Sequence, residues 1–251
     1  MKLKITVFLL LITTSFSLFA TDFEAKLIFD TYSAQNKIAV DFSFSERLSN
    51  NIFVDAKLMH RESNNYFAYC AGRFQVKSLL FSLGMGFDIQ DSQMAPGVLA
   101  NLNWKFSKRF SFDGNIFAGF ARENLYKNQI LDIDGGIIIH TENNNTKISY
   151  NFKRNRINSN EKQYHSGTIS LLAFEKGLPF RIGLDTRFSF LFEETNPELF
   201  KLFVDVGGKI EFHTLKFGYY TVGGKARILD FSQTDSPLQF SLFAGIGFTL
   251  D

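Results

Sequence analysis

The stretch FRIGLDTRFSFLF at residues 180–192 carries the pattern that decides the fold of this chain. Its even-numbered positions are apolar apart from one threonine. The odd-numbered positions from 181 to 189 hold arginine, glycine, aspartate, arginine and serine. Successive side chains of a β-strand point to opposite faces, whereas an α-helix repeats every ~3.6 residues. The stretch therefore predicts a strand with one apolar face and one polar face.

The same period of two recurs along the chain, for example in FSLGMGFDIQ at residues 81–90 and in VLANLNWKF at residues 98–106. We expect about fourteen strands, near residues 22–31, 37–46, 51–60, 66–76, 80–90, 97–107, 110–121, 130–141, 146–155, 166–175, 180–193, 199–211, 215–224 and 238–250. Strands of soluble proteins have ~5–6 residues, whereas a tilted strand that crosses a membrane needs ~9–11. The expected lengths favour membrane crossing.

Composition excludes several other classes of protein. The 251 residues include 27 basic and 25 acidic ones, so the net charge of +2 gives no electrostatic reason to expect nucleic-acid binding. The mean hydropathy of −0.04 and the lack of an apolar run near ~18 residues argue against a helical membrane protein. An all-β barrel of this length forms one domain.

The N-terminal segment has the order of a secretory signal. Lys2 and Lys4 precede the apolar run ITVFLLLI at residues 5–12, and a Thr/Ser-rich stretch follows that ends at Ala20. Positive, apolar and small-residue parts in this order are typical of a cleaved signal peptide. We predict a signal peptide over residues 1–20 and a single barrel domain over residues 21–251.

The spacing of the expected strands favours an up-and-down barrel. Short connections are expected near residues 47–50, 76–78, 107–109, 142–145, 176–179 and 212–214. They alternate with connections that are mostly longer, such as 122–128, 155–165 and 225–237. Outer-membrane barrels have short periplasmic turns and longer outer loops. We predict an antiparallel up-and-down transmembrane β-barrel, with a secreted soluble β-sandwich as the alternative.

The last stretch, LQFSLFAGIGFTLD at residues 238–251, resembles the C-terminal insertion signal of bacterial outer-membrane β-barrels, a porin-like superfamily. That signal combines a glycine with two later alternating hydrophobic residues, and Gly245, Phe248 and Leu250 match its spacing. Phe243 and Asp251 depart from it. The resemblance implies a location in the bacterial outer membrane, contact with outer-membrane lipids, and assembly by the barrel-insertion machinery.

The polar face of each strand is expected to line the barrel interior. We select seven charged residues as lumen-lining: Arg73, Lys105, Asp132, Asp134, Arg181, Asp185 and Arg187. Several aromatic residues are expected on the same face and would narrow the path: Phe53, Phe67, Tyr69, Phe117, Phe174, Phe203 and Phe243. The mixed signs predict a passive channel with weak ion selectivity for ions or small polar solutes. A closed, structural barrel with a surface-contact role is the alternative.

Sequence motifs for catalysis are weak. Membrane acyl hydrolases need a serine next to a histidine base, and none of the four histidines occurs as His-x-Ser. His165 and Ser166 are adjacent, but in a strand they would point to opposite faces. We find no metal-ligand cluster, P-loop or dinucleotide fingerprint, and we expect no cofactor and no enzymatic activity. An outer-membrane lipid hydrolase is the third hypothesis, and oligomeric state is not indicated.

Overall fold

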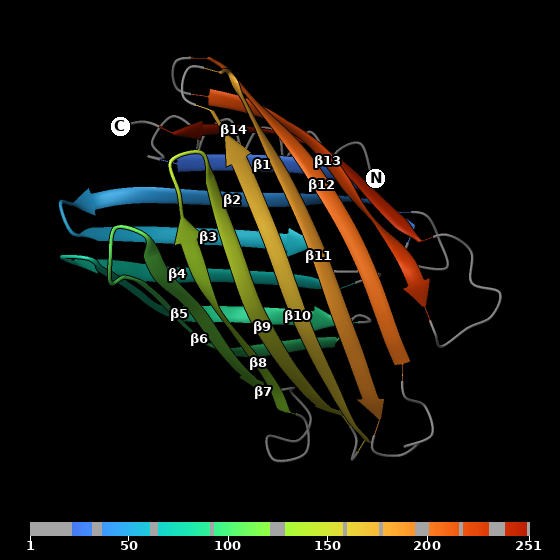
Figure 1. Cartoon of the computed structure of the whole chain (residues 1–251). Coiled ribbons are helices and arrows are strands. Elements are labelled where there is room, and N and C mark those ends of the chain that lie inside the picture. The colour runs from blue at the N-terminus through green and yellow to red at the C-terminus, as the bar shows by residue number, and fades with distance from the viewer. Residues whose placement is uncertain are drawn as a thin grey trace, which may run out of the picture.

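The computed structural model describes residues 22–31, 37–60, 65–90, 93–120, 129–157, 160–175, 178–193, 201–215, 218–230 and 239–249. Within these residues, fourteen strands form one closed antiparallel barrel, in which each strand pairs with its neighbours in sequence (Figure 1). Among the same residues, no helix is long and apolar enough to cross a membrane. The predicted signal peptide at 1–20 lies outside the described residues.

The strands account for most of the described chain. They are β1 (Asp22–Asp30), β2 (Lys37–Ser49), β3 (Ile52–His60), β4 (Tyr66–Val76), β5 (Leu79–Gln90), β6 (Gln93–Lys105), β7 (Phe110–Phe120), β8 (Gln129–His140), β9 (Asn144–Ile157), β10 (Asn160–Phe174), β11 (Phe180–Glu193), β12 (Lys201–Leu215), β13 (Gly218–Asp230) and β14 (Phe240–Thr249). The prediction of about fourteen long antiparallel strands in an up-and-down barrel is confirmed.

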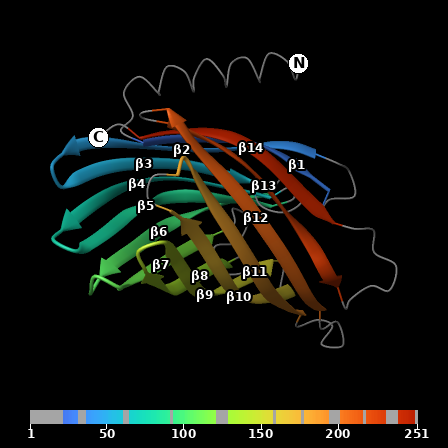
Figure 2. The same ribbon diagram turned by 45° about the horizontal axis from the view of Figure 1, so that its top comes forward.

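Pairing between the first and last strands closes the barrel. The register runs without a shift from Asp22 opposite Thr249 to Asp30 opposite Ser241. Figure 2 shows β1 and β14 side by side, with the remaining strands following around the wall. A closed sheet leaves no strand edge unpaired, and this closure lets a sheet cross hydrocarbon that offers no hydrogen bonds.

Several strands extend further than their sequence patterns predict. β2 ends at Ser49 rather than 46, and β12 ends at Leu215 rather than 211, so the short connection expected at 212–214 is wrong. β10 begins at Asn160 rather than 166, β13 continues to Asp230 rather than ending at 224, and β6 begins at Gln93 rather than 97. The predicted long connections over 155–165 and 225–237 are therefore wrong in part, because much of each is strand. At 158–159 and 231–238 the chain lies outside the described residues.

The two faces of the wall differ in chemistry as the alternation predicts. Outward positions hold large exposed hydrophobic side chains on all sides, including Leu83, Met85, Val98, Ile148 and Leu184. Buried polar side chains such as Asp88, Asp132 and Asp205 occupy inward positions. An apolar belt around a closed barrel is suited to lipid and not to water. The outer face of the barrel is therefore suited to span a bilayer.

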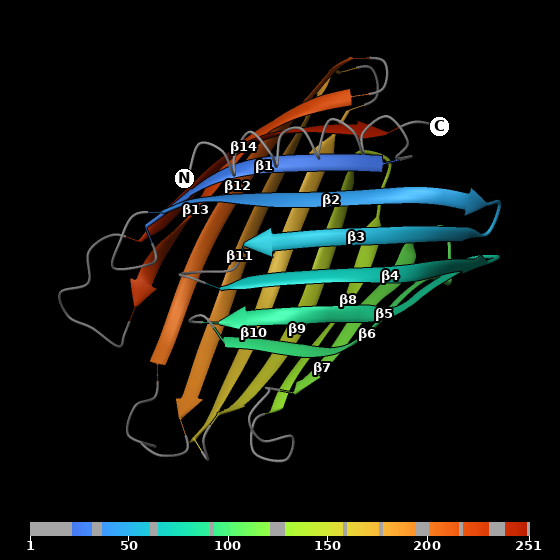
Figure 3. The same cartoon turned by 180° about the vertical axis from the view of Figure 1, so that it is seen from behind.

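The barrel has two opposed walls whose strands run in different directions. Figure 1 and the reverse view in Figure 3 show β2–β5 on one wall and β9–β12 on the other, with the two sets crossing at a large angle. The walls converge toward β6 and β7 in both views. This geometry brings side chains of non-neighbouring strands together inside the barrel.

Leu184→Arg tests the lipid-facing assignment. Leu184 is 53% exposed near the middle of β11, and an arginine at the bilayer midplane costs about 2–4 kcal/mol. We expect this loss in the free energy of unfolding, measured by reversible denaturant titration in phospholipid vesicles. Leu178→Arg is the control, because Leu178 precedes β11 in a short connection and a charge near the interface costs only ~0–1 kcal/mol. Equal stability of the two variants would contradict the assignment.

Candidate functional site: the barrel interior

One half of the interior is filled by packed apolar side chains. Phe67 on β4 and Phe117 on β7 are each 1% exposed, and their ring centroids lie 4.9 Å apart in an edge-to-face contact. β5 and β6 lie between these two strands in the barrel order. The two rings therefore come from strands that are not paired, and they meet across the interior. The same cluster includes Ala71, Ala95, Leu99 and Ile130.

Glycines on the inner wall make room for the Phe117 ring. A Cβ atom at Gly97 would lie 2.7 Å from Phe117 Cζ, and a Cβ at Gly119 would lie 2.8 Å from Phe117 Cε1. Both distances are shorter than van der Waals contact, so a larger residue at either position would displace the ring. The ring packs against bare backbone at these two positions.

An ion pair crosses the interior beside this cluster. Lys153 Nζ on β9 lies 2.8 Å from Asp88 Oδ2 on β5, and the side chain of Asp88 is completely buried. Three strands, β6 to β8, separate the two in the barrel order. Removing one partner of a buried ion pair is strongly destabilising, so the contact with Lys153 stabilises the approach of β9 to β5.

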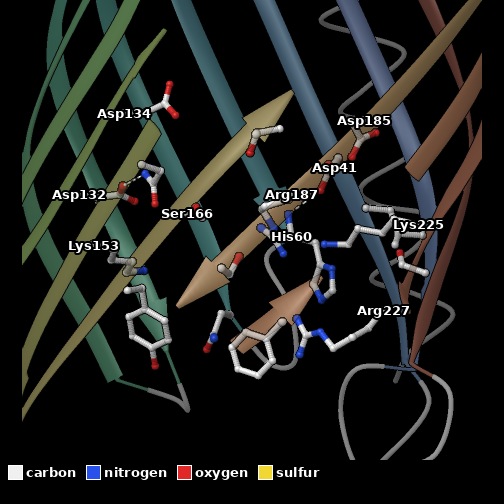
Figure 4. A pocket seen from close by; sticks show the side chains of 18 of the residues that line it. Asp41, His60, Asp132, Asp134, Lys153, Ser166, Asp185, Arg187, Lys225 and Arg227 are labelled. Atoms are coloured by element: carbon white, nitrogen blue, oxygen red, sulfur yellow. Dashed lines mark hydrogen bonds between the residues drawn. The ribbon is translucent and has the colours of Figure 1, made fainter. Parts of the chain in front are cut away.

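The other half of the interior contains a cavity of about 690 Å³. Its lining comes from β1–β3 and β8–β14 together with residue 65, and includes Asp41, Asp132, Asp134, Ser166, Asp185, Arg187, Lys209, Lys225 and Arg227. Figure 4 shows Asp132, Asp134 and Lys153 on one side of the cavity and Asp41, Asp185, Arg187, Lys225 and Arg227 on the opposite side. Both sides thus carry both signs, with carboxylates in excess on the first side and cations in excess on the second.

The basic side is built around one buried carboxylate. Asp205 is 2% exposed and accepts hydrogen bonds from two arginines: Arg187 Nη2 lies 2.7 Å from Oδ2, and Arg227 Nε lies 2.9 Å from Oδ1. Arg227 also donates to Gln239 Oε1 at 3.1 Å and lies 4.3 Å above the Phe203 ring. Two cations on one anion give this cluster a net positive charge with fixed orientation.

The acidic side is held by side chains of β9. Asn151 Nδ2 donates to Asp132 Oδ1 at 2.7 Å. Lys147 Nζ lies 2.7 Å from Asp113 Oδ2 and 3.7 Å from Asp134 Oδ1. With Lys153 and its partner Asp88 included, four carboxylates face two lysines here, so this side has an excess of negative charge that opposes the basic cluster across the cavity.

The seven residues selected from sequence fall into two groups. Four of them line the cavity: Asp132, Asp134, Asp185 and Arg187. The other three lie toward the end of the barrel with short connections. Arg73 Nε pairs with Asp55 Oδ2 at 3.2 Å, Lys105 is the exposed last residue of β6, and Arg181 lies 6.0 Å from the Phe174 ring.

Sequence reasoning missed two components of the cavity. Lys225 and Arg227 were expected in a loop, because the pattern of β13 weakens at a register irregularity where Val204 pairs with Leu229 and Asp205 pairs with Arg227. The Asp88–Lys153 contact was missed as well, since pairing between distant strands leaves no local signal in the sequence.

The expected separation of His165 and Ser166 is observed. Both residues are in β10; Ser166 lines the cavity (Figure 4), while the His165 ring contacts the rings of Tyr150, Phe152 and Phe192. The structure instead joins another serine and histidine. Ser111 Oγ lies 2.8 Å from His140 Nε2, and His140 Nδ1 lies 2.8 Å from Asn145 Oδ1.

This Ser111–His140–Asn145 network lies near the short-connection end of β7, β8 and β9. If Nδ1 of His140 donates to Asn145, Nε2 accepts from the Ser111 hydroxyl, which is the hydrogen-bond order of a nucleophile and its base. Ser111 is only 3% exposed, however. A nucleophile must reach its substrate, and so the burial of Ser111 favours a structural role.

The residues that resemble an insertion signal lie in β14. A Cβ at Gly245 would lie 2.4 Å from the Ala25 carbonyl oxygen, so this position requires glycine for close approach to β1. Phe248 lies 6.3 Å from Phe23, ring centroid to ring centroid, and Leu250 is outside the described residues. Recognition by the insertion machinery stays a prediction.

Solved structures with the same architecture are known. The CymD monoaromatic hydrocarbon channel is 8% identical over 92% of this chain and 89% of its own, with a TM-score of 0.59. A bacterial polysaccharide outer membrane secretin is 7% identical over 92% and 98%, with a TM-score of 0.58. A loop-deletion mutant of OmpT from Vibrio cholerae is 7% identical over 90% and 96%, with a TM-score of 0.56. The chain has a porin-like fold.

At these low identities the likeness establishes the fold of the porin-like barrel and nothing finer. No protein-family model and no curated protein matches the chain. The expected chemistry of this porin-like barrel therefore rests on its own interior residues.

Lys153→Met tests the ion pair that crosses the porin-like barrel. Removing the cation withdraws a charged partner from the buried Asp88 carboxylate, so we expect a loss of about 3–5 kcal/mol in the free energy of unfolding in vesicles. The double variant Asp88→Leu/Lys153→Met should recover most of this loss. Lys147→Met is the matched control, because its partner Asp113 is more exposed and such pairs contribute ~0–1 kcal/mol. A neutral Lys153→Met would overturn the assignment.

Proposed function

We propose that this barrel is a passive channel through which ions or small polar solutes pass along its open half. The observation that carries the proposal is the cavity of about 690 Å³, lined by charged side chains of both signs inside a membrane-spanning wall. Side chains that only sealed the barrel would be expected to pack as Phe67 and Phe117 do on the other side. The polar cavity offers a route for groups that lipid excludes.

The uneven distribution of charge across the cavity favours one kind of solute. A solute in the cavity has the Asp205–Arg187–Arg227 cluster on one side and Asp132 and Asp134 on the other. Opposed charges orient a dipolar or zwitterionic solute while giving little net preference between simple cations and anions. One structural neighbour is named a channel for monoaromatic hydrocarbons. The charged lining here favours polar solutes instead.

A closed structural barrel with a surface-contact role is the second candidate. Its support is the packed half of the interior, where Phe67, Phe117 and the Asp88–Lys153 pair join the two walls. The two candidates differ in one measurable property. A channel conducts ions in a planar bilayer, whereas an occluded barrel does not.

We expect discrete single-channel currents from the refolded protein in planar bilayers. Arg187→Gln/Arg227→Gln removes two cations from the cavity, so the reversal potential in a salt gradient should shift toward cation selectivity. Asp132→Asn/Asp134→Asn should shift it toward anions. Lys105→Gln, a change at the exposed end of β6 outside the cavity lining, is the control and should leave selectivity close to that of the wild type. Silence after repeated, verified insertions would favour the closed barrel.

We propose that the protein is not an enzyme, and Ser111 provides the test. The buried hydroxyl should not react with a fluorophosphonate probe, so intact-protein mass spectrometry of wild type and Ser111→Ala should show the same low labelling. Ser166→Ala is a second comparison for the cavity-lining serine. Stoichiometric labelling of the wild type that either substitution abolishes would restore the hydrolase hypothesis.

A further inference from the structure

The outer face of the barrel carries charge in one concentrated place. On the described strands, alternation directs the ionised side chains of Arg154, Arg156, Glu161 and Glu46 outward. Glu46 lies on β2 near a short connection, whereas the other three cluster on β9 and β10 at the opposite end. We call Arg154, Arg156, Glu161 and Gln163 the β9–β10 outer patch.

Pairing along β9 and β10 orders this patch by polarity. From the strand ends inward, the outward pairs are Arg156 with Glu161 and Arg154 with Gln163, followed by Phe152 with His165 and Ile148 with Ile169. Charged, aromatic and aliphatic pairs thus succeed one another along the wall. The same order runs from the headgroups of a bilayer to its hydrocarbon, so the patch lies at headgroup level.

Contacts within the patch leave arginine donors available. Arg154 Nε lies 3.6 Å from Glu161 Oε2, and Gln163 Nε2 donates to Glu161 Oε1 at 2.7 Å. A guanidinium has five N–H donors, and the contact of Arg154 with Glu161 is through Nε. Arg156 is exposed to its surroundings. Two arginines against one glutamate give the patch a net positive charge.

The aromatic row beneath the patch is joined by a hydrogen bond and by ring contacts. Tyr150 Oη lies 2.5 Å from His165 Nδ1, and the His165 ring packs at 5.1 Å from Phe152 and 5.5 Å from Phe192 between ring centroids. This row is suited to the upper part of acyl chains. If the acyl chains of a lipid lie against these rings, its headgroup lies at Arg154 and Arg156.

We propose that the β9–β10 outer patch binds the phosphate groups of a phosphorylated lipid headgroup, in the leaflet at the end opposite the short connections. Arginine presents a planar fork of donors that matches phosphate oxygens in a bidentate way. An outward arginine that stays in hydrocarbon is destabilising, and contact with headgroups or water removes this cost. The proposal does not depend on conduction through the interior.

Native mass spectrometry of the refolded full chain in detergent, titrated with lipid A that carries two phosphates, tests the site. Arg154→Gln/Arg156→Gln should weaken binding by about tenfold or more, since it removes charge-assisted hydrogen bonds. Arg154→Lys/Arg156→Lys retains the charge but lacks the fork, so its affinity should lie between. Lys108→Gln/Arg109→Gln removes the same charge from the opposite end and should bind as the wild type does.

Lipid A without phosphates, and inorganic phosphate alone, distinguish the parts of the ligand. Dephosphorylated lipid A should bind wild type no better than it binds the glutamine variant, and millimolar inorganic phosphate should not compete. Equal lipid binding by wild type and glutamine variant would overturn the proposal. So would a change confined to self-association, which would assign the patch to contact between copies of the chain. Heat-modifiable electrophoretic mobility verifies that each variant is folded.

Discussion

Hydrocarbon offers no hydrogen bonds, and this constraint governs the whole structure. Every backbone N–H and C=O that crosses the bilayer needs a partner within the protein, at a cost of several kcal/mol when it has none. The chain meets the constraint by pairing β1 with β14 over nine positions, from Asp22 opposite Thr249 to Asp30 opposite Ser241. Once the ring is closed, strict alternation assigns each side chain to lipid or to the interior.

Closure also explains why the interior has two different halves. An interior with fourteen strands is wider than side chains fill unaided, so either water occupies it or the walls approach one another. On the side of β4 to β8 the walls approach: Phe67 contacts Phe117 over inner-wall glycines, and Lys153 reaches Asp88. On the other side polar residues keep a cavity with opposed charges. Contacts on the packed side hold the walls together, and the cavity on the other side is the part through which we propose that solutes pass.

The sequence predicted the number of strands and the faces of their residues, because lipid requires an uninterrupted apolar row. It failed at strand ends, where that requirement relaxes. Glu161, Gln163 and His165 occupy outward positions of β10, so their polarity resembled a loop. In β13 the irregularity near Ile228 interrupts the period, which hid Lys225 and Arg227.

The start of β6 contains a proline, which a strand accepts where its missing N–H is not needed. Pro96 pairs with Phe87 of β5, while pairing of β6 with β7 begins only at Gly97, so the proline removes no hydrogen bond to β7.

Contacts across the interior were beyond any local pattern. Asp88 and Lys153 lie on the polar faces of their strands, and polar faces were expected to line the interior. Nothing in their neighbouring residues, however, indicates which opposite strand they approach. The Ser111–His140–Asn145 network has the same origin, since its members are joined by register between β7, β8 and β9 and not by a short motif. Which inward side chains meet depends on how the closed barrel brings its strands together, and the periodicity of the sequence does not specify this.

The most direct test of the central claim is a cysteine scan of residues 182–189 on β11, in a Cys70→Ser background, with a spin label at each position in lipid bilayers. Collision with oxygen, which partitions into lipid, should be greatest at even positions such as Leu184 and Phe188. Collision with a water-soluble nickel chelate should be greatest at odd positions such as Asp185 and Arg187. An absence of alternation, or the reverse assignment of the two faces, would contradict the account.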